Sequence, residues 1–146
     1  MNNTTTQLNA LAPEYVPTFT KAGRALLTVV SKKTGQRFTF RIQRKNNVAA
    51  GPLFVKVLTG SQNESDYTFL GTIFDDQTFV HSKKSSIDPE APSARAFTWF
   101  WSHVQVGSMS SMDVYHHGRC ARCGRTLTVP ESIASGIGPE CAKKGF

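Results

Sequence analysis

The stretch Arg24–Lys45, "RALLTVVSKKTGQRFTFRIQRK", decides the fold because it predicts a β-hairpin. Two runs of β-branched and aromatic residues are joined across "KKTGQ", where Gly35 can adopt the positive φ of a tight turn. Along the second run, side chains alternate between two faces of the strand. One face carries the apolar set Phe38, Phe40 and Ile42, and the other carries the polar set Arg37, Thr39, Arg41 and Gln43. The hairpin therefore has an apolar face and a basic face.

The segments after the hairpin predict three more strands and one helix. "PLFVKVLTG", "YTFLGTIF" and a short "TFV" are strand-like, and no helical pattern lies between them, which favours an antiparallel sheet. "SSIDPEAPSARAFTWFWSHVQVG" predicts a helix that starts near Pro92 and ends at Gly107. Its apolar residues form one stripe that should lie across the sheet: Ala96, Phe97, Phe100, Trp101 and Val104. We expect an α+β fold of about five antiparallel strands with one covering helix, followed by a small C-terminal module that contains all three cysteines.

The chain divides into four parts on composition. With 146 residues, 39% of them apolar, it has room for one domain and a small appendage. Residues 1–20 are rich in Asn, Thr and Pro and predict a flexible arm, and residues 21–107 hold the sheet and helix. Residues 108–115, rich in Ser, predict a linker, and residues 116–146 are expected to form the small C-terminal module.

The charge is distributed unevenly along the chain. The formal net charge is +7, and the segment between Glu14 and Glu64 contains nine Lys and Arg residues but no acid. From Glu64 to Glu90 the balance reverses, with six acidic residues against Lys83 and Lys84. Such separation can draw a polyanion to one face, although basic residues on exposed strand positions would give the same pattern.

Three cysteines near the C-terminus predict a metal site. Cys120 and Cys123 form a C-x2-C knuckle followed by Gly124, and Cys141 returns eighteen positions later. A fourth ligand is needed for a tetrahedral site, and both His116 and His117 are close enough in sequence to supply it. We expect a structural Zn2+ held by Cys120, Cys123, Cys141 and His116, with His117 as the alternative. A dithiol switch is the rival interpretation, but the thioredoxin-like pattern that accompanies such switches is absent.

The stretch "ASGIGPECAKK" resembles the hairpin of helix-hairpin-helix DNA-binding motifs. In that arrangement Gly136 and Gly138 would let free backbone N–H groups approach a phosphate. The alternative is that these glycines only turn the chain so that Cys141 reaches the knuckle. Both interpretations are compatible with a metal-bound turn.

Taken whole, "HHGRCARCGRTLTVPESIASGIGPECA" resembles a zinc-knuckle segment of small bacteriophage proteins assigned to a family of unknown function. The resemblance covers about residues 116–146 through the motifs C-x2-C-G-R, L-T-x-P-E-S and G-I-G-P-x-C. It implies a phage origin and a metal site, and a histidine four positions before the first cysteine corresponds to His116. It implies no biochemical activity.

Nucleic-acid binding is the function that the sequence favours. The acids lie mainly in turns, and the histidines lie in the knuckle or singly at His81 and His103, so we expect no enzymatic activity. No recognition helix is evident, whereas basic strand residues with aromatic neighbours such as Phe54, Tyr67 or Trp99 favour single-stranded DNA or RNA. The predicted contacts are Lys32, Lys33, Arg37, Arg41, Arg44, Lys45, Arg119, Arg122, Arg125, Lys143 and Lys144.

A module that binds or inhibits a host protein, through the acidic segment 64–90 or a sheet edge, is the alternative function. No secretory signal or membrane-spanning apolar run is present, and the odd number of cysteines argues against a disulfide scaffold. We therefore expect a cytoplasmic protein, in the host cell if it is phage-encoded, with no membrane partner. The sequence leaves the oligomeric state open.

Overall fold

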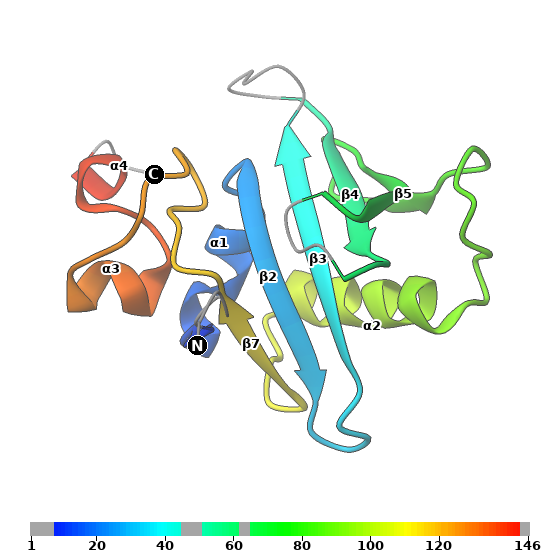
Figure 1. Cartoon of the computed structure of the whole chain (residues 1–146), viewed down its shortest axis with the longest axis horizontal. Coiled ribbons are helices and arrows are strands. Elements are labelled where there is room, and N and C mark those ends of the chain that lie inside the picture. The colour runs from blue at the N-terminus through cyan, green and yellow to red at the C-terminus, as the bar shows by residue number, and fades with distance from the viewer. Residues whose placement is uncertain (1–7, 45–50, 62–64, 144–146) are drawn as a thin grey trace.

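A seven-stranded antiparallel sheet organises the chain (Figure 1). The computed structural model describes residues 8–44, 51–61 and 65–143. The strands are β1 (Asn9–Ala10), β2 (Arg24–Ser31), β3 (Arg37–Arg44), β4 (Leu53–Leu58), β5 (Tyr67–Ile73), β6 (Phe79–His81) and β7 (Met112–His116). The helices are the 3-10 turn η1 (Pro13–Tyr15) and α1 (Val16–Thr20), α2 (Pro92–Val106), α3 (Pro130–Ser135) and α4 (Pro139–Lys143).

The strands follow the order β1-β7-β2-β3-β4-β5-β6, and every neighbouring pair is antiparallel. The predicted hairpin is confirmed as β2 and β3, with Ala25 opposite Ile42 and Leu27 opposite Phe40. Gly35 in its turn has a φ of 77°. The expected antiparallel α+β class is confirmed, but the sheet has two strands more than the five expected, namely β1 and β7.

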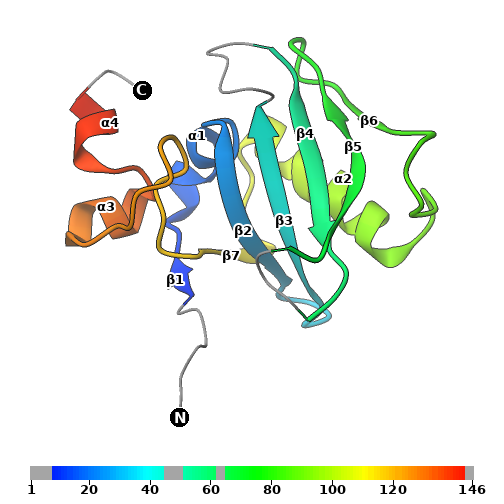
Figure 2. The ribbon, with the colours of Figure 1, turned by 45° about the horizontal axis from the view of Figure 1, so that its top comes forward.

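The core lies between the sheet and α2. Alternation along β2, β3 and β4 places Leu27, Phe40 and Val55 on one face, where they are fully buried. α2 covers this face with Phe97 and Phe100, whose rings pack on Phe40 at centroid distances of 5.0 and 6.4 Å. Figure 2 shows α2 on this side alone, and no helix in the described ranges covers the opposite face of β2–β5.

Strand β7 corrects the predicted domain boundary. Residues 108–115 were expected to be a linker, yet β7 lies inside the sheet between β1 and β2. Met112, Val114 and His116 are buried while Asp113 is exposed, so this short run has the period of two of a half-buried strand. The C-terminal segment is therefore joined to the sheet through its own strand.

The N-terminal segment also differs from the expected flexible arm. Residues 1–7 lie outside the described part of the chain, but residues 9–20 form β1, η1 and α1. Val16 and Phe19 are buried, and Leu11 donates a backbone hydrogen bond to Val114 at 2.9 Å. Apolar residues spaced through a polar stretch tie this segment to β7 and the C-terminal segment.

Candidate metal centre

The fold brings the three cysteines together, as their spacing predicts. The Sγ atoms of Cys120, Cys123 and Cys141 all lie within 4.8 Å of one another, and all three thiols are free. Cys120 and Cys123 lie in a tight turn closed by the bridge between Arg119 and Thr126, and Cys141 lies on α4. Cys120 and Cys141 are buried, whereas Cys123 is exposed.

Backbone N–H groups converge on the sulfur of Cys120. Gly138 donates at 3.2 Å, Arg122 at 3.4 Å and Cys123 at 3.5 Å. Burial raises the pKa of Cys120, but these hydrogen bonds outweigh it and the pKa lies below the ordinary value of a thiol. The knuckle thus stabilises a thiolate at Cys120.

Cys141 shows the opposite shift. Burial, followed by the two neighbouring sulfurs, raises the pKa of Cys141 to about 11. Three thiolates repel one another in a partly buried site, and a bound cation would remove that cost. Thiolates at about 2.3 Å from one tetrahedral ion lie about 3.8 Å apart, so sulfurs within 4.8 Å need only small movements to bind one metal ion. The donor set fits a thiophilic metal ion.

His116 is not part of this cluster, which corrects the prediction that it is the fourth ligand. Its side chain is fully buried, and both ring nitrogens already have partners. Nδ1 accepts a hydrogen bond from the Gly118 N–H at 3.0 Å, and Nε2 donates to the Ile133 carbonyl at 2.5 Å. Burial lowers the pKa of His116, which keeps the ring neutral with one donor and one acceptor. The residue connects the start of the knuckle to α3.

His117, the alternative ligand, faces the sheet. Its Nε2 lies 3.0 Å from Oγ1 of Thr28, and that hydroxyl in turn lies 2.7 Å from Oγ1 of Thr39. Burial, followed by electrostatic repulsion from the protonated form of His116 and from Arg41, lowers the pKa of His117 to about 4. Among the described residues, no His, Asp or Glu joins the three sulfurs as a fourth ligand.

The glycine loop favours packing over phosphate binding. The Gly136 N–H donates to Ser132 O at 2.7 Å, and the Gly138 N–H donates to the Cys120 sulfur. Gly136 has a φ of 75°, and a Cβ atom there would collide with the Phe19 ring. Both N–H groups are therefore used inside the fold, and the helix-hairpin-helix interpretation is not supported by this geometry. The glycines turn the chain so that Cys141 reaches the knuckle.

The candidate metal centre is hydrogen-bonded to the sheet at Arg24. The Arg24 N–H donates to Ala121 O at 2.7 Å, and its Nη1 donates to Cys123 O at 3.1 Å. Ala121 in turn donates to Gly136 O at 2.9 Å. One residue at the start of β2 thus holds two carbonyls of the knuckle.

The cationic residues that were predicted to contact nucleic acid lie on both segments that Arg24 joins, the hairpin and the C-terminal segment. Lys32 and Lys33 lie in the hairpin turn, and Arg37 and Arg41 are on β3. Arg44, at the end of β3, is half-buried and donates its backbone N–H to Gly23 O at 3.0 Å. Arg119, Arg122, Arg125 and Lys143 are exposed around the three sulfurs or on α4. Lys45 and Lys144 lie outside the described residues.

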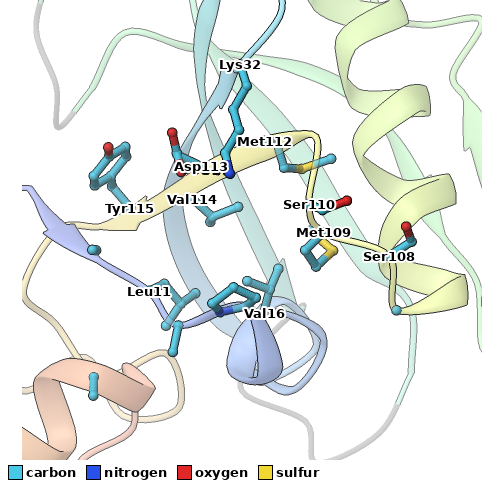
Figure 3. Close-up of a pocket in the computed structure, with 15 residues that line it drawn as sticks. Leu11, Val16, Lys32, Ser108, Met109, Ser110, Met112, Asp113, Val114 and Tyr115 are labelled. Atoms are coloured by element: carbon cyan, nitrogen blue, oxygen red, sulfur yellow. Dashed lines mark ion pairs between the residues drawn. The ribbon is translucent and has the colours of Figure 1, made fainter.

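A separate cavity of about 760 Å³ lies between the N-terminal segment and β7 (Figure 3). Its lining is mainly apolar, with Leu11, Val16 and Met109 among the contributing side chains. Lys32 and Asp113, which also line it, form an ion pair at 3.9 Å. None of the three cysteines lines the cavity, so it is distinct from the candidate metal centre.

Comparison with known proteins gives one match. A family model described as a family of unknown function (DUF6011) matches residues 111–144, which is less than half of the chain. The match agrees with a C-terminal domain of unknown function over the segment that contains the cysteine cluster, and it carries no indication of a phage origin. It begins one residue before β7. No curated protein and no solved structure matches the chain. Within the described ranges, no helix has the length and apolar character needed to cross a membrane.

Proposed function

We propose that the protein binds nucleic acid without catalysing a reaction, with a preference for single strands, and that a zinc ion at Cys120, Cys123 and Cys141 has a structural role. Zinc fits because thiolates are among its usual ligands in structural sites. When bound, it supplies a fixed positive centre that offsets the repulsion between the sulfurs. The chain's own residues orient them, through the N–H groups aimed at Cys120.

The observation that carries the nucleic-acid proposal is the contact at Arg24, which joins the knuckle to the open end of the basic hairpin, where β2 starts and β3 ends. Segments about 100 residues apart in sequence meet there, with Arg24 on β2 and Cys123 in the knuckle. Exposed cations lie on both segments, including Arg37 on β3 and Arg125 in the knuckle. Lys32 pairs with Asp113, but both side chains are about half exposed, at 53% and 49%, and a pair of this kind is weak. Phosphate groups are the natural partners of such a surface.

The position of the acidic residues supports a non-catalytic role. A catalytic zinc would need a nearby general base, for which Glu140 is the adjacent candidate in sequence. Glu140 is exposed on α4 and does not belong to the sulfur cluster. A cytoplasmic location and a phage origin complete the proposal. The first is supported by three free thiols, and the second by the motifs of the C-terminal segment.

The test is the salt dependence of binding to a labelled 20-nucleotide single-stranded DNA, followed by fluorescence anisotropy with metal-loaded protein. The logarithm of the affinity should fall linearly with the logarithm of salt concentration, at about 0.7 per phosphate contacted. Arg37→Ala and Arg125→Ala should each reduce this slope by about one contact. The matched control is the double variant Lys83→Ala/Lys84→Ala, which removes exposed positive charge from the acid-rich segment. It should leave the slope unchanged.

A chelator arm of the same assay tests the structural role of the metal. Removal of the ion should weaken nucleic-acid binding, because the knuckle then loses the conformation that it has beside β2. Absence of binding by metal-loaded protein at low salt would overturn the proposal and leave the protein-binding module as the better explanation.

A further inference from the structure

The sheet face opposite α2 carries aromatic side chains. On β4, Leu53, Val55 and Val57 are buried toward the helix, so Phe54 and Lys56 project from the other face. The register places Phe69 opposite Lys56 and Tyr67 opposite Leu58, so both rings project from this same face. Figure 1 looks onto it, with α2 behind the strands.

These rings are partly exposed and cluster together. Phe54, Phe69 and Tyr67 are all half-buried, in contrast to the fully buried Phe40 and Phe97 under the helix. The Phe54 and Phe69 rings lie 6.2 Å apart, centroid to centroid, at an interplanar angle of 64°. Three aromatic side chains on two adjacent strands therefore share one open surface, which we call the open aromatic face.

Cations lie among the rings. The Arg41 guanidinium carbon is 4.5 Å from the centroid of the Tyr67 ring, and Arg41 is directly opposite Lys56 in the β3–β4 register. His117 lies close enough to Arg41 for that charge to depress its pKa. Strands β2 to β5 contain no Asp or Glu, so no carboxylate on these four strands opposes an anionic ligand.

We propose that the open aromatic face binds single-stranded nucleic acid by stacking bases on Phe54 and Phe69, while Lys56 and the Arg41 guanidinium over Tyr67 contact the backbone phosphates. This inference rests on the proposed function and adds the ligand class and the surface that selects it. Aromatic side chains stack on any unpaired base, whereas the bases of a duplex are already stacked on one another. Interleaved cations add phosphate contacts and explain why the ligand is an anion and not an apolar peptide.

The test uses two substitutions that remove a ring while keeping an apolar side chain. Phe54→Leu and Phe69→Leu should each weaken binding of a labelled dT20 oligonucleotide by about 5- to 100-fold, the range expected for loss of one stacked base. The salt slope should stay the same, because no phosphate contact is lost. Tyr15→Leu removes an exposed ring on η1, outside the face, and is the matched control, with no change in affinity.

Photocrosslinking with the wild-type chain makes the test independent of folding in the variants. An oligonucleotide containing 5-iodouracil should crosslink to peptides that contain residues 53–58 or 67–73. Duplex DNA of the same length should compete at least tenfold less well than the single strand. Thermal unfolding followed by circular dichroism verifies that each variant is folded.

The outcomes separate the two proposals. Wild-type affinity in both folded Leu variants, or crosslinks confined to the knuckle, would overturn the stacking proposal while salt-dependent binding upholds the proposed function. Equal competition by duplex would overturn the stacking proposal together with the proposed preference for single strands. Complete absence of oligonucleotide binding at low salt would overturn both.

Discussion

His116→Ala should destabilise the protein by about 3–6 kcal/mol and leave the metal bound at the three cysteines. The imidazole is fully buried and has two hydrogen bonds, from the Gly118 N–H and to the Ile133 carbonyl. Alanine leaves both backbone groups buried without a partner, which costs about 1–3 kcal/mol each. The lost ring also leaves a void beside Phe19, whose ring centroid is 5.8 Å from that of His116.

A loss of this size is a large part of the roughly 5–15 kcal/mol that stabilises an ordinary domain, so His116→Gln serves as the companion variant. Its amide can restore one of the two hydrogen bonds, and the loss should be about half that of alanine. Urea unfolding followed by circular dichroism measures the free energy. Metal per chain is measured by mass spectrometry of the dialysed protein.

The control is Cys123→Ser, which removes a proposed ligand from an exposed position. This variant should lose the metal at little direct packing cost, the reverse of the pattern expected for His116. A folded His116→Gln protein that loses its metal as Cys123→Ser does would show that the imidazole is a ligand. The reasoning from its two hydrogen bonds would then be wrong.

Two further predictions concern the loop and the second histidine. Gly136→Ala should cost about 2–4 kcal/mol in urea unfolding, because a Cβ there meets the Phe19 ring in addition to the strain of its positive φ. Gly107→Ala, at a φ of 73° with open space around it, should cost only about 1 kcal/mol, and equal losses would contradict the packing argument. Burial is the main cause that lowers the pKa of His117 to about 4. Its neutral form therefore stabilises the fold fully above about pH 6.5, and this contribution is lost as the pH falls toward 4. His117→Asn should flatten stability across that window relative to wild type, and an unchanged pH profile would refute the assignment.

The hairpin and the covering helix were predictable because their signals are local. The alternation around Phe40 and the stripe around Phe97 each specify a buried face without knowledge of the rest of the chain. The cysteine cluster was predictable for a different reason. A C-x2-C pair followed by a later cysteine has few structural roles other than metal binding.

Strand β7 was missed because its neighbours in the sheet are distant in sequence. Met112, Val114 and His116 alternate correctly, but a five-residue run after "GSMSS" has too little apolar character to outweigh the Gly and Ser signal before it. Its partners are β2, some 85 residues earlier, and β1, about 100 residues earlier. Local pattern contains no information on such pairing.

The role of His116 could not be read from spacing. A histidine four residues before a knuckle can coordinate the ion or hold the surrounding backbone, and both roles have the same sequence pattern. Only the positions of Gly118 and Ile133 around the ring distinguish them. The acceptor of its Nε2 proton lies on α3, seventeen residues further along the chain.

The place of β7 in the sheet has a consequence for biosynthesis. β1 pairs only with β7 among the described strands, so Asn9 and Ala10 emerge from the ribosome about 100 residues before their partner exists. At about 5–20 residues per second, that interval is about 5–20 s. During it, the outer edge of β2 has no hydrogen-bonded neighbour in the nascent chain, and this edge is covered only after Met112–His116 have been synthesised.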